Sequence, residues 1–145
     1  MTAAASWVFI DTNILIYAYD DSEGKKHSIA KNVVADLWRQ GTGLLSTQVL
    51  QEFYNVATRK LKPPMPYARA RKLVASYSNW VSMNTDPQLL VSASLLQENH
   101  RLQWWDALIL ESALRSGATT LLSEDMQDGR KFGMLSVRNP FVEGN

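Results

Sequence analysis

The sequence predicts an α/β fold with a parallel sheet, because short apolar runs alternate with segments of helical periodicity. Residues 7–10 are apolar, aromatic and β-branched and stop at Asp11, as expected of a strand buried on both faces. Over residues 28–40 apolar positions recur at helical spacing, and Gly41 stands where a C-terminal helix cap belongs. A further candidate strand, Thr119-Thr120-Leu121-Leu122, follows a helical segment closed by Gly117. This alternation requires right-handed crossovers between parallel strands.

The first half of the chain supplies two more helices and a minimal strand. Residues 13–19 have helical character, and the polar stretch 20–26 indicates a loop. Leu44 and Leu45 are expected to form a short strand. After them, apolar residues at helical spacing predict a helix over 47–58.

The second half begins with a proline-rich break, at Pro63, Pro64 and Pro66, which no helix can cross. We expect a helix over 67–79 and a strand over 80–83 after it. Asp86 and Pro87 then have the order of a cap and a first-turn proline, for a helix that reaches about residue 98. The remaining expected elements are a helix over 105–116, the strand over 119–122, a turn at 128–129 and a strand over 135–137.

The composition fits one domain over residues 1–145. A chain of 145 residues buries roughly 70% of its unfolded surface, enough for a substantial core. The chain has no cysteine, which excludes disulfides, zinc–thiolate sites and cysteine nucleophiles. Its net charge of +1 indicates no particular partner. Because neither a signal peptide nor a membrane span is recognisable, we expect a cytoplasmic protein that does not contact membranes.

Two acidic residues follow predicted strands directly. Asp11 ends the first strand, and Asp125 comes shortly after Leu122. Ligand sites in open α/β sheets lie beyond the carboxyl ends of the strands, so neighbouring strands would bring both carboxylates to one edge. Each aspartate alone could equally be a helix cap or a turn residue.

Asp106 is in a less ordinary place, since it lies within the apolar stripe of its predicted helix, with Ile109 and Leu110 on the same face. A buried carboxylate there must be protonated, paired or bound to a cation. The simpler reading is a first-turn acid favoured by the helix dipole. Trp104 and Trp105 suggest that the helix start is buried.

Glu52 lies at the edge of an apolar arc and could be an ordinary surface residue. If Asp11, Glu52, Asp106 and Asp125 converge, carboxylates 4 Å apart repel by roughly 4 kcal/mol at an effective dielectric near 20. Either their pKa values rise, or divalent cations occupy the site. Oxygen ligands favour Mg²⁺ or Mn²⁺ over zinc. Asn13 and Ser123 could orient the carboxylates or serve only as capping residues.

A stretch without any acid runs from residue 53 to residue 85. Such a stretch is most often a solvated surface, but beside a phosphodiester-cleaving site it could hold an RNA backbone, with nearby aromatic residues stacking on bases. The basic residues within it are Arg59, Lys60, Lys62, Arg69, Arg71 and Lys72.

Four segments together resemble the motifs of PIN-domain ribonucleases, in particular the VapC-like toxins of bacterial toxin–antitoxin pairs. The resemblance covers nearly the whole chain, and Ser123 stands where the family often has threonine. The segments are Asp11-Thr12-Asn13, Glu52, Trp105-Asp106-Ala107-Leu108 and Leu121-Leu122-Ser123-Glu124-Asp125.

This resemblance implies a three-layer α/β/α fold with a central parallel sheet of about five strands. It also implies a Mg²⁺ or Mn²⁺ centre held by Asp11, Glu52, Asp106 and Asp125, cleavage of RNA, a homodimer and inhibition by a small antitoxin. Glu124 and Asp128 compete for the role of Asp125, although Asp128 is better explained as a turn residue.

Other functions remain possible at this point. An aspartyl phosphatase requires a second aspartate where Asn13 stands, and a receiver domain requires a late lysine in register. A module that binds nucleic acid or an antitoxin without turnover would keep the same fold, and a housekeeping RNA-processing nuclease would keep the same chemistry.

Overall fold

The computed structural model describes residues 6–142 of the chain, whose sheet has five strands in the order β2-β1-β3-β5-β4. Neighbouring strands are parallel except for the pair β4 and β5. The expected α/β fold is therefore confirmed, and the sheet, expected to be parallel, is parallel except for this one pair. The strands are β1 Val8–Ile10, β2 Gly43–Leu44, β3 Thr120–Leu122, β4 Lys131–Phe132 and β5 Leu135–Arg138.

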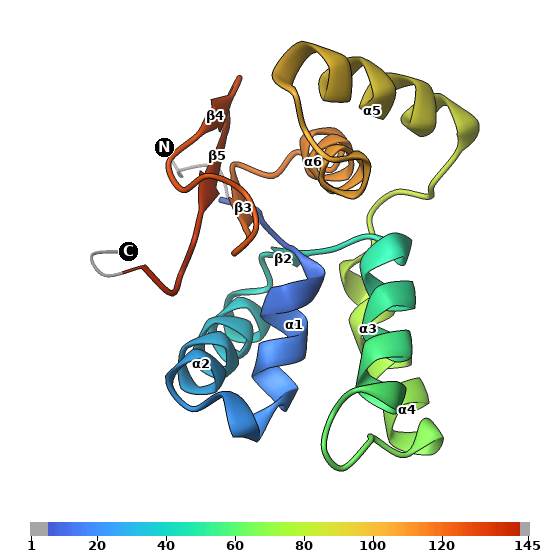
Figure 1. Ribbon diagram of the computed structural model, residues 1–145, viewed down its shortest axis with the longest axis vertical. Coiled ribbons are helices and arrows are strands. Elements are labelled where there is room, and N and C mark those ends of the chain that lie inside the picture. The colour runs from blue at the N-terminus through green and yellow to red at the C-terminus, as the bar shows by residue number, and fades with distance from the viewer. Residues whose placement is uncertain (1–5, 143–145) are drawn as a thin grey trace.

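The described residues also form six α-helices (Figure 1). Helices α1 and α2 lie on one side of the sheet and α5 and α6 on the other, while α3 and α4 pack side by side next to α1. None of the helices in the described part of the chain is long and apolar enough to cross a membrane. The helices are α1 Thr12–Tyr19, α2 Lys25–Gln40, α3 Thr47–Arg59, α4 Tyr67–Tyr77, α5 Pro87–His100 and α6 Trp104–Arg115, with short 3-10 helices at Asp21–Glu23 and Ser78–Trp80.

Helix ends follow the local signals in the sequence. The Asp86 carboxylate accepts a hydrogen bond from the Leu89 amide at 2.9 Å and caps α5, whose first residue is Pro87. Gly41 closes α2 in the left-handed conformation, at φ 69°, which glycine adopts without strain. The polar stretch after α1 is shorter than expected, because α2 begins at Lys25.

The strand expected over residues 80–83 is wrong. Residues up to Trp80 form a 3-10 turn, and Val81 makes only one bridge, to Leu45. Trp80 is buried, and its ring lies against the backbone of Gly43 in β2. The segment therefore packs a side chain against the outer strand of the sheet instead of adding a strand to it. The strand that completes the sheet is β4, which pairs with β5 around a turn that begins at Gly133, at φ 59°.

The register of the central strands determines where the functional residues lie. Ile10 at the end of β1 pairs with Leu122 at the end of β3. The Asp11 amide still donates to the Leu122 carbonyl at 2.9 Å, so the segments after β1 and β3 leave the sheet at the same carboxyl edge. Phe9 and Leu121 in these strands are almost fully buried, which anchors the edge on the core.

The contact between Gly43 and Trp80 leaves no room for a larger residue in β2. An added Cβ on Gly43 would lie 2.7 Å from Trp80 ring atoms. We therefore expect Gly43→Ala to lower the free energy of unfolding by about 1–3 kcal/mol, measured by urea denaturation. In a Trp80→Leu background the same substitution should cost clearly less, and equal costs in both backgrounds would contradict this explanation.

Candidate metal centre

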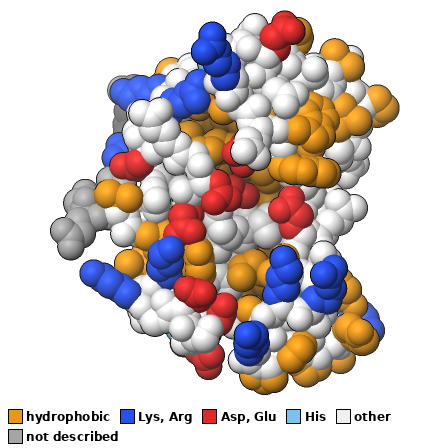
Figure 2. All heavy atoms as spheres, viewed as in Figure 1, with side chains coloured by type: hydrophobic (Ala, Val, Ile, Leu, Met, Phe, Trp, Pro, Cys, Tyr) orange, Lys and Arg blue, Asp and Glu red, His pale blue; other side chains and the backbone are white. Residues whose placement is uncertain are grey.

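A cleft of about 360 Å³ opens at the carboxyl edge of the sheet, between α1, α3 and α6. Figure 2 shows Asp and Glu side chains gathered across the middle of the face that contains it. In the described part of the chain no lysine or arginine lines this cleft. Its electrostatic potential is therefore set by its acidic residues, which are Asp11, Asp20, Glu23, Glu52, Asp106 and Asp125.

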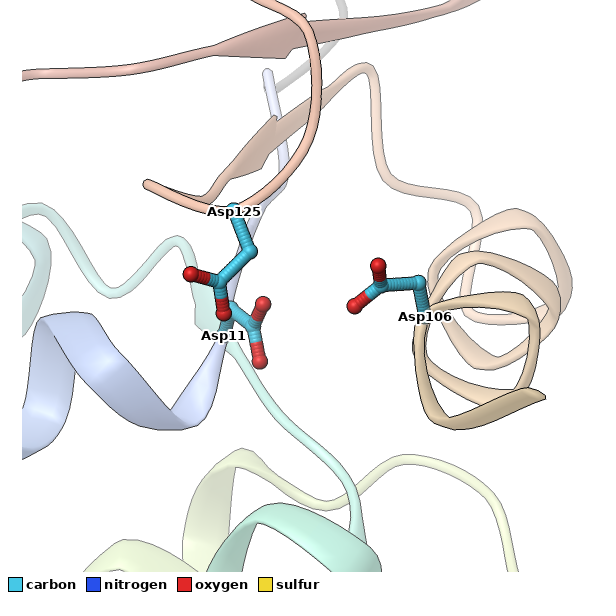
Figure 3. Close-up of side chains that lie close together, drawn as sticks. All are labelled: Asp11, Asp106 and Asp125. Atoms are coloured by element: carbon cyan, nitrogen blue, oxygen red, sulfur yellow. The ribbon is translucent and has the colours of Figure 1, made fainter. Parts of the chain in front are cut away.

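Three aspartates from distant parts of the sequence meet in the cleft (Figure 3). Each of Asp11, Asp106 and Asp125 offers a carboxylate oxygen, and these oxygens all lie within 4.8 Å of one another. Asp11 precedes α1, Asp106 lies in the first turn of α6, and Asp125 lies in the loop after β3. The sheet register and the packing of α6 therefore bring together three of the four acids predicted from the sequence.

Asp11 is the most buried of these acids, with 5% of its surface exposed. Its carboxylate accepts hydrogen bonds from the Thr12 amide at 2.7 Å and from the Ser123 hydroxyl at 2.8 Å. Burial raises the pKa of Asp11 from 3.8 to about 7, although these two hydrogen bonds oppose the change. Asp11 thus functions both as the cap of α1 and as a carboxylate that is costly to ionise without a cation.

Asp106 is half-buried in the first turn of α6, whose N-cap residue Gln103 makes no side-chain capping hydrogen bond. Desolvation raises its pKa, and the charges of Asp125 and Glu52 raise it further. The expectation of a buried helix start is wrong, because Trp104 is only partly buried and Trp105 is 64% exposed at the mouth of the cleft. The helix dipole alone therefore does not account for Asp106, because the residue faces other acids.

Asn13 and Ser123 hold the exposed Asp125 in place. The Asn13 amide donates to the Asp125 carboxylate at 3.0 Å, and the Asp125 backbone amide donates to the Ser123 hydroxyl at 3.2 Å. Because Ser123 also donates to the Asp11 carboxylate, one buried hydroxyl links that carboxylate to the backbone of Asp125. Both predicted polar residues thus contact the acids of the cleft.

Glu124 and Asp128 are engaged elsewhere. Glu124 accepts a hydrogen bond from the Tyr17 hydroxyl at 2.7 Å and pairs with Lys26 at 2.6 Å. Burial opposes its ionisation, but Lys26 and Tyr17 outweigh this effect and lower its pKa. Asp128 accepts from the Asn139 amide at 2.9 Å, within the turn region. Asp125 is therefore the residue of this segment that joins Asp11 and Asp106.

Glu52, on α3, lines the same cleft but is not part of the group of three. Its two carboxylate oxygens accept hydrogen bonds from the Thr12 hydroxyl at 3.2 Å and from the Gln48 amide at 2.8 Å. The structure therefore places Glu52 on the wall of the cleft, close enough to raise the pKa of Asp106.

The donors in the cleft fit a hard divalent cation. The three converging groups supply only oxygen, which suits Mg²⁺ or Mn²⁺. Neither histidine of the chain lines the cleft, and the chain has no cysteine, so the donors do not suit zinc. A cation would also offset the repulsion among the carboxylates and the desolvation of Asp11.

The basic residues of the acid-free stretch do not line the acidic cleft. Figure 2 shows several lysine and arginine side chains over the region of α3 and α4, beside the acidic middle of the face. Among the described residues, none of them takes part in an ion pair. All six are exposed: Arg59, Lys60, Lys62, Arg69, Arg71 and Lys72.

Comparison with known proteins indicates a family for the chain. The sequence model of the PIN domain family matches residues 8–127, which include Asp11, Glu52, Asp106 and Asp125. No curated protein sequence is similar enough to count as a match.

Solved structures share the fold at low sequence identity. A toxin–antitoxin complex from Klebsiella pneumoniae contains a chain with 20% identity and a TM-score of 0.66, matched over 94% of this chain and 98% of that one. VapBC2 from Rickettsia felis, bound to a DNA fragment from its promoter, has 16% identity and a TM-score of 0.61 over 91% and 97%. VapC20 from Mycobacterium tuberculosis, a toxin that cleaves the sarcin-ricin loop, has 19% identity and a TM-score of 0.57 over 79% and 86%.

The raised pKa of Asp11 predicts a pH-dependent stability in the absence of divalent cations. The unfolded chain ionises this residue near pH 3.8 and the folded chain near pH 7. Between these values the folded state binds the extra proton, so its stability falls as pH rises, by at most about 1.4 kcal/mol per pH unit, and levels off above the folded pKa.

We expect the free energy of unfolding in EDTA to fall more steeply between pH 4 and pH 7 for the wild type than for Asp11→Asn. Asp36→Asn is the matched control, because Asp36 is exposed on α2 and pairs with Arg39. It should keep the wild-type slope. Parallel curves for the wild type and Asp11→Asn would contradict the assigned burial effect.

Proposed function

The chain belongs to the PIN domain family, and on this premise we propose that it is a Mg²⁺- or Mn²⁺-dependent endoribonuclease and the toxin of a toxin–antitoxin pair. The observation that carries the proposal is the convergence of Asp11, Asp106 and Asp125 within one cleft. Three carboxylate oxygens lie there within 4.8 Å of one another, which a shared cation would favour and their mutual repulsion disfavours.

In this proposal Asp11, Asp106 and Asp125 hold the cation, and Glu52 is the fourth acid of the site. When bound, a divalent cation stabilises negative charge on the phosphoryl group and lowers the pKa of coordinated water. Asp11 must lose its proton to become a ligand, so cation affinity should increase as pH rises toward 7.

The remaining polar residues orient these acids. The Thr12 amide and the Ser123 hydroxyl direct the two oxygens of Asp11, and Asn13 directs Asp125. The Thr12 hydroxyl and Gln48 hold Glu52 on the opposite wall. Such fixed carboxylates need little reorganisation when a cation and a phosphodiester enter the cleft.

We assign the RNA backbone to the basic residues of α3, α4 and the loop between them. Apart from a bound cation, the acidic cleft offers no positive charge to the phosphates of the backbone, because no described lysine or arginine lines it. The exposed and unpaired cations nearby supply the charge that binding to a polyanion requires. The residues proposed to contact RNA are Arg59, Lys60, Lys62, Arg69, Arg71 and Lys72.

We further propose a small antitoxin as a partner, since the similar structures from Klebsiella and Rickettsia are described as toxin–antitoxin assemblies.

The proposed homodimer has a candidate surface on α5. There Leu90, Val91 and Leu95 are between 42% and 57% exposed, which is unusual for aliphatic residues clustered on one helix.

The first test is RNA cleavage by Asp106→Asn. This substitution removes one carboxylate of the three, so we expect Mg²⁺- or Mn²⁺-dependent cleavage to fall at least about a hundredfold. In EDTA the variant should be no less stable than the wild type, because a desolvated acid is replaced by a neutral amide. Cleavage is measured on a panel of structured and single-stranded RNAs.

Asp36→Asn is again the control and should cleave at the wild-type rate. Cation binding, measured by calorimetry, distinguishes a ribonuclease from a module that binds RNA without cleaving it. Equal cleavage by the wild type and Asp106→Asn would refute the proposed site. RNA binding by the wild type without cation uptake or cleavage would instead favour a binding module that does not turn over.

The second test concerns the basic residues. Replacing both Lys60 and Lys62 with alanine should weaken the binding of single-stranded RNA for all sequences alike. Each lost phosphate contact should also reduce the slope of log affinity against log salt by about 0.7. Affinity is measured at several salt concentrations in EDTA, and Lys131→Ala on β4 is the control. An unchanged slope would show that these lysines do not contact the backbone.

A further inference from the structure

A second cleft continues from the acidic one along α3. It has a volume of about 410 Å³ and is lined by Trp105, Gln48, Gln51, Glu52 and Asn55. Trp105, Gln48 and Glu52 line both clefts, so the two spaces adjoin. This space, here called the Trp105 cleft, is within the size range of small-ligand sites, and the proposed cleavage chemistry makes no use of it.

Trp105 forms one wall of the Trp105 cleft, and 64% of its surface is exposed. Among the exposed large hydrophobic residues of the described chain, it alone lines the acidic cleft. It precedes Asp106 directly, so its ring is attached to the same helical turn as a proposed cation ligand. An indole ring in this position offers a flat apolar face on which a nucleobase can stack.

The opposite wall carries three amide side chains. Gln48, Gln51 and Asn55 are three and four residues apart on α3 and therefore share one face of the helix. Gln48 donates to Glu52, and Asn55 accepts from Arg59 at 3.3 Å. Each amide has both a donor and an acceptor, so the row still offers groups of both kinds, as the edges of nucleobases require.

The charge of the Trp105 cleft favours a base over a phosphate. Within residues 6–142 the only charged residue that lines it is Glu52, whose carboxylate would repel a phosphate. An uncharged base avoids this repulsion, while the aromatic ring and the amides match its face and its edge. An aliphatic protein segment would leave the amides unpaired, which is unfavourable.

We propose that the Trp105 cleft binds one unpaired nucleobase of the RNA, adjacent to the phosphodiester that the aspartate centre cleaves. Trp105 stacks on the base, and the amide row contacts its edge. This inference rests on the proposed ribonuclease function and adds to it a recognition site for a flanking nucleotide.

The test combines a change in the protein with a change in the RNA. Trp105→Leu should lower kcat/KM about tenfold, while Trp105→Phe, which keeps an aromatic face, should retain most of the activity. Removing the base from the nucleotide on one side of the cleavage site should cause a similar loss for the wild type. For Trp105→Leu the same abasic RNA should cause almost no further loss, because the stacking contact is already absent.

Trp7→Leu is the matched control, since Trp7 is 39% exposed and lines neither cleft. It should leave kcat/KM unchanged. Equal losses for Trp105→Leu on intact RNA and on every abasic RNA would overturn the inference. The inference would also be overturned if Trp105→Leu changed the oligomeric state, measured by size-exclusion chromatography, and left cleavage intact. Trp105 would then contact protein and not RNA.

The two proposals can fail separately. Normal cation-dependent cleavage by Trp105→Leu would overturn the base site and leave the ribonuclease assignment standing.

If the wild type cleaves no RNA, the ribonuclease assignment fails. Tryptophan fluorescence in EDTA then tests the base site alone. Quenching by single-stranded RNA that is lost in Trp105→Leu and retained in Trp7→Leu would support the base site, and quenching that is equal in both variants would overturn it.

Discussion

The mutual repulsion of Asp11, Asp106 and Asp125 is the constraint on which the candidate site depends. Their oxygens approach within 4.8 Å only because two parallel strands end in register and the start of α6 faces that edge. The donors around them are neutral: a backbone amide, a hydroxyl and a side-chain amide. Neutral donors orient the carboxylates without cancelling their negative charge, so the carboxylates still attract a cation. A lysine or arginine in the same place would weaken that attraction.

Much of the arrangement could be predicted from the sequence because it depends on local signals. The apolar run that ends at Asp11 predicts the central strand, and Asp86 with Pro87 predicts the start of α5. Acids placed directly after parallel strands share an edge in any open α/β sheet, which is why the meeting of Asp11 and Asp125 could be expected. The resemblance to the PIN domain family, carried by four short segments, is confirmed over residues 8–127.

The errors arose where packing between distant segments decides the structure. The run over 80–83 has strand composition, but Trp80 packs on Gly43 and the segment makes a single bridge. Strand β4 has only two residues, which are too few to show any periodicity. Gly133 nevertheless indicates the turn between β4 and β5. The two tryptophans at the start of α6 predict a buried helix start, and only the tertiary structure shows Trp105 at the mouth of the cleft. The choice among Glu124, Asp125 and Asp128 likewise required partners, Tyr17 and Lys26, that are distant in sequence.

Both outer strands of the sheet, β2 and β4, have two residues each, and this has a consequence for self-association. On the β2 side the Leu45 amide is already bonded to the Trp80 carbonyl, at 3.1 Å, and β4 carries an exposed Lys131. Within residues 6–142, neither border offers the long row of vacant amides and carbonyls that templates amyloid-like stacking. Copies of this chain that gather at high concentration should therefore meet through helix surfaces and remain able to separate.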